Sequence, residues 1–87
     1  MDPAEERLLA ETEKWLSRLE EKAASMKALK KSKELDNSME NISAYIEDCR
    51  HFLSQKDYIN AFEAVVYAWG ILETLERLKL IECKKGT

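Results

Sequence analysis

The amino-acid sequence predicts an all-α fold, an antiparallel up–down–up bundle of three helices. Charged residues make up 36% of the chain, and Lys, Glu, Leu and Ala dominate it, as is typical of helical bundles. Two Gly and one Pro leave too few turn residues for a sandwich or barrel. Apolar residues recur at spacings of three, four and seven in three segments, which is the period of amphipathic helices. We therefore expect one domain at residues 1–82, followed by a polar tail at 83–87.

The first helix is predicted at about residues 3–30. Asp2 can cap it, Pro3 suits the first helical position, and Glu5 completes a capping box. Lysines 27, 30 and 31 would then oppose the negative end of the helix dipole in the last turn. The apolar stripe of this segment consists of Leu8, Leu9, Trp15, Leu16, Leu19, Ala23, Met26 and Leu29.

The second helix is predicted at about residues 35–55 and the third at about 58–79. The stripe of the second consists of Leu35, Met39, Ile42, Ile46, Cys49 and Leu53. Its start stays open, because four residues near it can act as caps: Ser32, Asp36, Asn37 and Ser38. Only Lys56 and Asp57 separate the second helix from the third, with Asp57 as the cap of the third. So short a connection predicts two antiparallel neighbours.

The third helix carries more apolar surface than one face can hold. Its predicted core face comprises Tyr58, Ala61, Phe62, Val65, Ala68, Trp69 and Leu72. A second stripe follows through Ile71, Leu75 and Leu78, and Gly70 stands where the two meet. A glycine inside a helix costs about 1 kcal/mol relative to alanine. Either the helix bends at Gly70, or this side is a contact surface, formed by Glu63, Tyr67, Gly70, Ile71, Thr74, Leu75 and Leu78.

Two other features could carry chemistry. The residues from Lys27 to Lys33 form a basic patch that could contact nucleic acid, although the net charge of −3 disfavours that partner. Asp48 and His51 have a helical spacing found in metal ligands, but one histidine is too few for a complete site. Cys49 falls on an apolar stripe, where a free cysteine acts as a small apolar side chain. We predict no catalytic, cofactor or metal site.

The expected location is the cytoplasm. No apolar run approaches the 18 residues or so needed to span a bilayer. The acidic start of the chain, MDPAEE, is the opposite of the basic start of a signal peptide. Two cysteines far apart in the sequence indicate reduced thiols rather than a disulfide framework.

The segment from Tyr45 to Ile81 resembles a small archaeal family of proteins of unknown function. The pattern is Tyr–x–x–Asp–x–x–x–Phe, a short turn, then Ala–Phe–x–Ala and Tyr–Ala–x–Gly. It is matched by Tyr45, Asp48, Phe52, Asp57, Ala61, Phe62, Ala64, Tyr67, Ala68 and Gly70. Lys56 departs from it, since the family has Gly before the Asp. The resemblance implies a compact bundle, similar to spectrin-like or albumin-binding domains, in an archaeal cytoplasm, and it implies no activity.

The leading hypothesis for function is a non-enzymatic protein-interaction or self-association module. Its partner would be a second copy or an unidentified protein, held on the outer face of the third helix. The alternative is a nucleic-acid-associated accessory protein that uses the patch Lys27–Lys33. A metal-binding or hydrolytic bundle around Asp48 and His51 is the least favoured.

Overall fold

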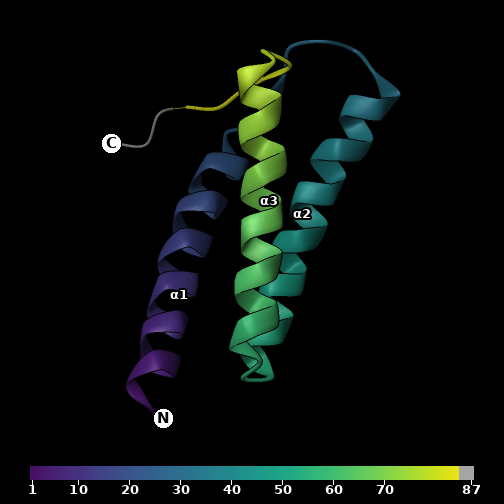
Figure 1. Ribbon diagram of the computed structural model, residues 1–87. Coiled ribbons are helices and arrows are strands. Elements are labelled where there is room, and N and C mark those ends of the chain that lie inside the picture. Colours follow the sequence, from purple (N-terminus) through teal and green to yellow (C-terminus); the bar gives the residue numbers. More distant parts are fainter. Residues whose placement is uncertain (85–87) are drawn as a thin grey trace.

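A computed structural model describes residues 1–84 and contains three helices and one short two-stranded sheet (Figure 1). The elements are α1 (Pro3–Ala24), β1 (Lys27–Ala28), α2 (Lys33–Ser54), α3 (Tyr58–Arg77) and β2 (Ile81–Glu82). Successive helices run in opposite directions. The predicted all-α, three-helix fold is therefore confirmed, and the sheet is a small addition to it.

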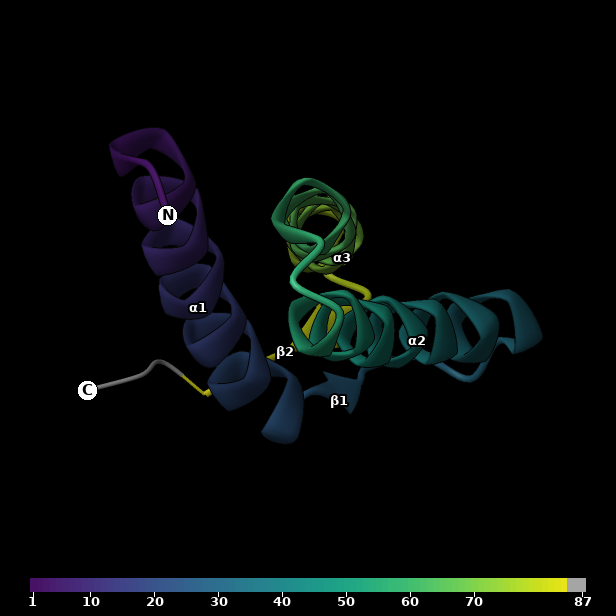
Figure 2. The same cartoon turned by 90° about the horizontal axis from the view of Figure 1, so that it is seen from below.

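Helix α3 is the central element of the bundle. It packs along both α1 and α2, whereas α1 and α2 touch each other at few points. Figure 2, viewed almost along α3, shows the other two helices diverging from it with the sheet between them. The bundle is thus open on one side, and α3 supplies most of the contacts that hold it together.

The start of α1 follows its capping signal, but its end does not follow its periodicity. The amide of Glu5 donates to Oδ1 of Asp2 at 2.8 Å, with Pro3 at the start of the helix. The helix ends at Ala24, so the prediction that it continues to about residue 30 is wrong. Residues beyond it instead form β1, which pairs antiparallel with β2. That pairing buries Ile81, which is 3% exposed, so apolar burial outweighs the local helical pattern.

Side-chain caps also set the starts of α2 and α3. The amide of Leu35 donates to Oγ of Ser32 at 3.2 Å, so Ser32 is the cap that the sequence left open. Asp57 accepts from the amide of Asn60 at 3.3 Å, as predicted. Between these helices Lys56 has φ 59°, a left-handed conformation that costs a non-glycine residue about 1 kcal/mol. The short turn makes α2 and α3 antiparallel neighbours with extensive contact.

The core fills the space between α3 and its two neighbours. It consists of Leu16, Leu19, Leu35, Ile42, Ile46, Cys49, Ala61, Ala64, Val65, Ala68, Leu72, Leu75 and Ile81. The polar Thr12 is also fully buried, and its hydroxyl donates to the carbonyl of Leu8 at 2.7 Å. This internal bond satisfies the hydroxyl, so the core holds a threonine at little cost.

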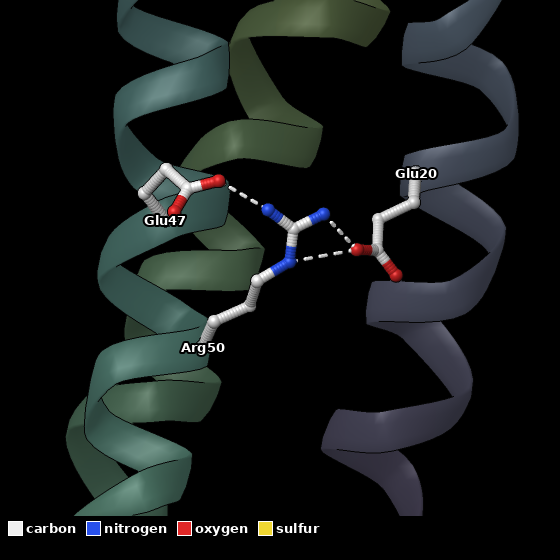
Figure 3. A network of polar contacts seen from close by, with 3 residues as sticks. All are labelled: Glu20, Glu47 and Arg50. Carbon is white, nitrogen blue, oxygen red and sulfur yellow. Dashed lines mark hydrogen bonds and ion pairs between the residues drawn. The ribbon is translucent and has the colours of Figure 1, made fainter.

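A charged bridge joins the two helices that have little apolar contact. Arg50 of α2 lies between Glu20 of α1 and Glu47 of α2 (Figure 3). Its Nε donates to Oε2 of Glu20 at 2.9 Å. The side chain of Glu20 is 35% exposed, that of Arg50 48% and that of Glu47 70%. Ion pairs at such a surface contribute roughly 0–1 kcal/mol. The bridge therefore orients α1 against α2 more than it stabilises the fold.

The chain after α3 turns back onto the bundle. Lys79 has φ 58°, and the amide of Leu80 donates to the carbonyl of Leu75 at 2.9 Å. The helix ends at Arg77, two residues before the predicted position. Of the predicted polar tail at 83–87, Cys83 is partly buried and the amide of Lys84 donates to Oγ of Ser25 at 2.9 Å. Residues 85–87 lie outside the described residues.

Candidate interaction surface on the third helix

Gly70 lies within an uninterrupted helix. The assignment of α3 runs continuously from Tyr58 to Arg77, and its turns overlie one another in Figure 2. The helix therefore does not bend sharply at Gly70, and the first of the two alternatives is wrong. A Cβ atom built at Gly70 would meet no heavy atom within 4 Å. Within residues 1–84, neither the backbone conformation nor crowding requires glycine at this position.

The inner and outer faces of α3 are cleanly separated around Gly70. Its six buried residues are Ala61, Ala64, Val65, Ala68, Leu72 and Leu75. Counted at about 100° per residue from Gly70, all six fall between about 120° and 220°. Gly70 therefore points directly away from the core. On its side of the helix Val66 is 50% exposed, Tyr67 55% and Ile59 72%.

The structure places most of the predicted surface residues on this outer face. Exposed members are Glu63, Tyr67, Gly70, Thr74 and Leu78, and Ile71 is half-buried. Leu75 is a correction, because it is buried and belongs to the core. The turn after Lys79 covers it by bringing Leu80 and Ile81 back onto the bundle. The angle of Leu75, about 140° from Gly70, is that of the inner face, so the error lay in grouping Leu75 with Ile71 and Leu78.

Two grooves flank Gly70 and share it. The first, here called the tryptophan groove, has a volume of about 410 Å³ and is lined by Trp15, Phe62, Val65, Val66, Trp69, Gly70 and Glu73. The second, the tyrosine groove, is shallower, has a volume of about 580 Å³ and is lined by Val66, Tyr67, Gly70, Ile71 and Thr74. Val66 and Gly70 line both grooves, so they form the ridge between them.

An aromatic pair joins α3 to a neighbouring helix beside each groove. On one side the rings of Trp15 and Trp69 meet edge to face, with centroids 5.8 Å apart. Nε1 of Trp69 donates to the carbonyl of Trp15 at 3.0 Å. On the other side the ring of Tyr67 stacks on that of Tyr45, at 5.6 Å. These pairs hold the groove walls in place, since such contacts add to the effect of burial alone.

Sequence reasoning missed part of this surface. Trp15 was expected in the core, but it is 36% exposed at the groove edge. Its ring lies under Lys14 and Arg18, whose cationic groups are 5.4 Å and 4.9 Å from its centroid. Val66 has the angular position of an outer residue, and that signal could have placed it on the surface. Trp15 lies about 100° from the buried Leu16 on α1, so its angle also places it at the edge of the stripe rather than at the centre.

The other predicted sites are not assembled in the described part of the chain. Within residues 1–84 no three side chains of His, Cys, Asp or Glu lie close enough to hold a metal ion. His51 is exposed, and its ring lies 5.9 Å from that of Phe52. Burial raises the pKa of the Cys49 thiol to about 11, so it is protonated at neutral pH. Burial also raises the pKa of Cys83.

The patch Lys27–Lys33 spans β1 and the turn into α2, and its lysines are exposed. The antiparallel ladder places Lys27 opposite Glu82, which offsets part of its charge. Nucleic-acid contact at this patch stays a prediction, and binding to RNA that weakens steeply with added salt would test it. Among residues 1–84, no helix combines the length and apolar character that a membrane span requires.

Comparisons with known proteins identify the family. Residues 14–81 match the family described as "Protein of unknown function (DUF357)". The crystal structure of protein AF1782 from Archaeoglobus fulgidus, which carries the same family assignment, is similar with a TM-score of 0.81 and 38% sequence identity. The match covers 93% of this chain and 99% of that one. The comparison with curated proteins finds no match. The predicted resemblance to an archaeal family is thereby confirmed, and the chain belongs to the DUF357 family of proteins of unknown function.

Proposed function

We propose that this protein is a non-enzymatic helical interaction module whose partner covers the outer face of α3. One observation carries the proposal. The ridge of Val66 and Gly70, with Tyr67 beside it, exposes apolar surface between two grooves on the side of α3 that points away from the core. Contiguous apolar surface with a polar rim is typical of protein-contact sites, and Glu63, Glu73 and Thr74 form such a rim.

The arrangement suits a partner helix. An amphipathic helix laid along α3 would place apolar side chains in the grooves on either side of Gly70, as in helix-in-groove recognition. The lack of a side chain at Gly70 lets two backbones approach closely. Burying a side chain such as Val66 contributes about 1.5–3 kcal/mol when it becomes fully covered. The aromatic walls need little rearrangement, which keeps the entropic cost of binding low.

The proposal places the protein in the cytoplasm. Both cysteines of the chain, Cys49 and Cys83, are free, as is usual in a reducing compartment. A helical partner in the same compartment would be either a second copy of this chain or another protein.

Replacement of Val66 by Asp tests the proposal. The tagged protein would be used to capture partners from extracts of the source cells, and its mass in solution would be measured by light scattering. If the partner is another protein, the charge at position 66 should abolish its capture. If the partner is a second copy, the charge should dissociate the oligomer and lower the mass measured in solution. Ala10→Asp is the matched control, because Ala10 is an exposed residue of α1 that lines none of the grooves beside α3.

Circular dichroism would check that both variants keep the helical fold. The proposal is supported when Ala10→Asp behaves like the wild type while Val66→Asp loses its partner. It fails if Val66→Asp retains every partner and the mass of the wild type.

A further inference from the structure

We propose that the partner is a second copy of this chain, with α3 packed antiparallel against α3 and the two helices crossing at Gly70. In this dimer Glu63 of each copy faces Arg77 of the other. The inference rests on the proposed function, since it uses the same outer face of α3. It adds the identity of the partner, the direction of packing and the residues that fix that direction.

The spacing of three outer residues carries the inference. Glu63, Gly70 and Arg77 are separated by seven residues each, and a seven-residue step stays on one stripe of a helix to within about 20°. Glu63 and Arg77 therefore lie on the same line as Gly70, about 10 Å to either side of it. A two-fold axis at Gly70 brings each residue opposite the one equally far beyond the glycine. It follows that both ends of the contact receive one acidic and one basic side chain.

The two charged side chains are free to make this contact. Both are exposed. The ion pairs found within residues 1–84 join Lys14 to Glu11, Lys22 to Glu76 and Arg50 to two glutamates. Neither Glu63 nor Arg77 takes part in any of them. A parallel arrangement would instead put Glu63 near Glu63 and Arg77 near Arg77, and like charges at such positions oppose association.

The crossing point also fits. At Gly70 a Cβ atom would project into open space, so no contact among residues 1–84 requires its absence. At the crossing of two helices it lets the axes come within about 8 Å. The same two-fold axis places Tyr67 of one copy beside Thr74 of the other, one residue from exact opposition but on the same flank of the contact, and both residues line the tyrosine groove. One contact therefore uses the glycine, the grooves and the free charges together.

The expected association is weak. A single pair of helices buries far less than the ~1,600 Å² of a standard interface. A dissociation constant on the order of 0.1 mM is therefore expected, and measurements should span about 10 μM to about 1 mM.

Two complementary single variants test the inference. Glu63→Arg alone gives a dimer with two Arg–Arg contacts, and Arg77→Glu alone gives one with two Glu–Glu contacts. We expect each to self-associate about tenfold more weakly than the wild type. Mixed in equal amounts, the two variants form a heterodimer in which both contacts are again Arg–Glu. Sedimentation should then show association restored to within about threefold of the wild type.

Glu40→Arg is the matched control, because Glu40 is an exposed residue of α2 and the change in charge is the same. Alone, it should associate like the wild type. Mixed with Arg77→Glu, it should not restore the association of that variant, because their heterodimer keeps one Glu–Glu contact. The inference is overturned if the wild type stays monomeric over the whole range, or if the mixture associates no better than the single variants. The proposed function is judged separately, by whether Val66→Asp loses a captured partner that Ala10→Asp keeps.

Discussion

The inner and outer faces of α3 differ in burial: neighbouring helices cover the inner face, whereas the outer face is exposed. On the inner face, Ala61, Ala64 and Ala68 are buried beside Val65 and Leu72. Small residues there let both α1 and α2 pack closely against α3. On the outer face Val66 and Tyr67 are half exposed, and Gly70 leaves open space. The residues of the inner face are buried by contacts within one chain. The outer face exposes apolar side chains and leaves open space at Gly70, which a bound partner could fill.

The comparison shows that glycine and alanine can serve different purposes on one helix. Alanine at 68 fits a neighbour that is present in the fold. A Cβ atom at position 70 would meet no heavy atom within 4 Å among residues 1–84, so packing in that part of the chain does not offset the helix-stability cost of glycine, about 1 kcal/mol. This contrast is what makes the two faces separable by mutation.

The largest expected effect concerns the inner face. Leu72 is fully buried, so Leu72→Ala should lower the free energy of unfolding by about 3 kcal/mol through lost burial and a cavity. Val66→Ala on the outer face should change it by less than about 0.5 kcal/mol in dilute solution. Urea denaturation at low protein concentration would measure both. Equal losses at the two positions would mean that the faces are not distinct.

A second test uses the ionisation of a core thiol that packs against the inner face. Burial raises the pKa of Cys49 from 9.0 to about 11. Below pH 9 the thiol is protonated in both the folded and the unfolded state, so this contribution to stability is fully present. Between pH 9 and pH 11 the unfolded chain loses the proton while the folded chain keeps it. The free energy of unfolding should therefore fall by roughly 2–3 kcal/mol over that range.

Cys49→Ala is the control for this pH dependence, because tyrosines and lysines also titrate in the alkaline range. The measurement is the difference between the two proteins in urea denaturation at several pH values. The variant should lose less stability than the wild type above pH 9. Parallel curves would show that Cys49 is not buried as described.

The smallest expected effect concerns the outer face. Gly70→Ala should raise the free energy of unfolding of the monomer by about 0.5–1 kcal/mol, since the added Cβ improves helix propensity and meets open space. It should also weaken self-association, because the methyl group occupies the crossing point. Thermal unfolding in dilute solution and sedimentation at high concentration would separate the two effects. A stabilised variant with unchanged association would remove Gly70 from the contact.

The local signals in the sequence predicted the elements well. The caps Asp2 and Asp57 and the apolar periodicity gave the three helices and the antiparallel turn between the last two. The errors arise where distant segments meet. The end of α1 at Ala24 depends on a strand that forms with Ile81 and Glu82, and nothing within α1 encodes it.

For the candidate surface, too, local signals predicted some features and missed others. Periodicity orients a residue on its own helix, and this put Tyr67, Gly70 and Thr74 correctly on the outer side. It says nothing about which neighbour covers that residue. Leu75 has the angle of the inner face and is buried there, so its error came from grouping it with Ile71 and Leu78. Trp15 is 36% exposed at the edge of the tryptophan groove, and the groove itself forms only when α1 packs on α3.

The most direct test of the α3 contact is an isotope-filtered NOE measurement on a mixture of ¹³C-labelled and unlabelled protein at high concentration. The isotope filter selects NOEs between a labelled and an unlabelled copy, so a contact between Tyr67 and Thr74 within one chain does not contribute to the signal. An antiparallel crossing at Gly70 predicts intermolecular NOEs from the Tyr67 ring to the Thr74 methyl group. Intermolecular NOEs from Tyr67 to Tyr67 and from Thr74 to Thr74 alone, or none from this face in an associated sample, would contradict it.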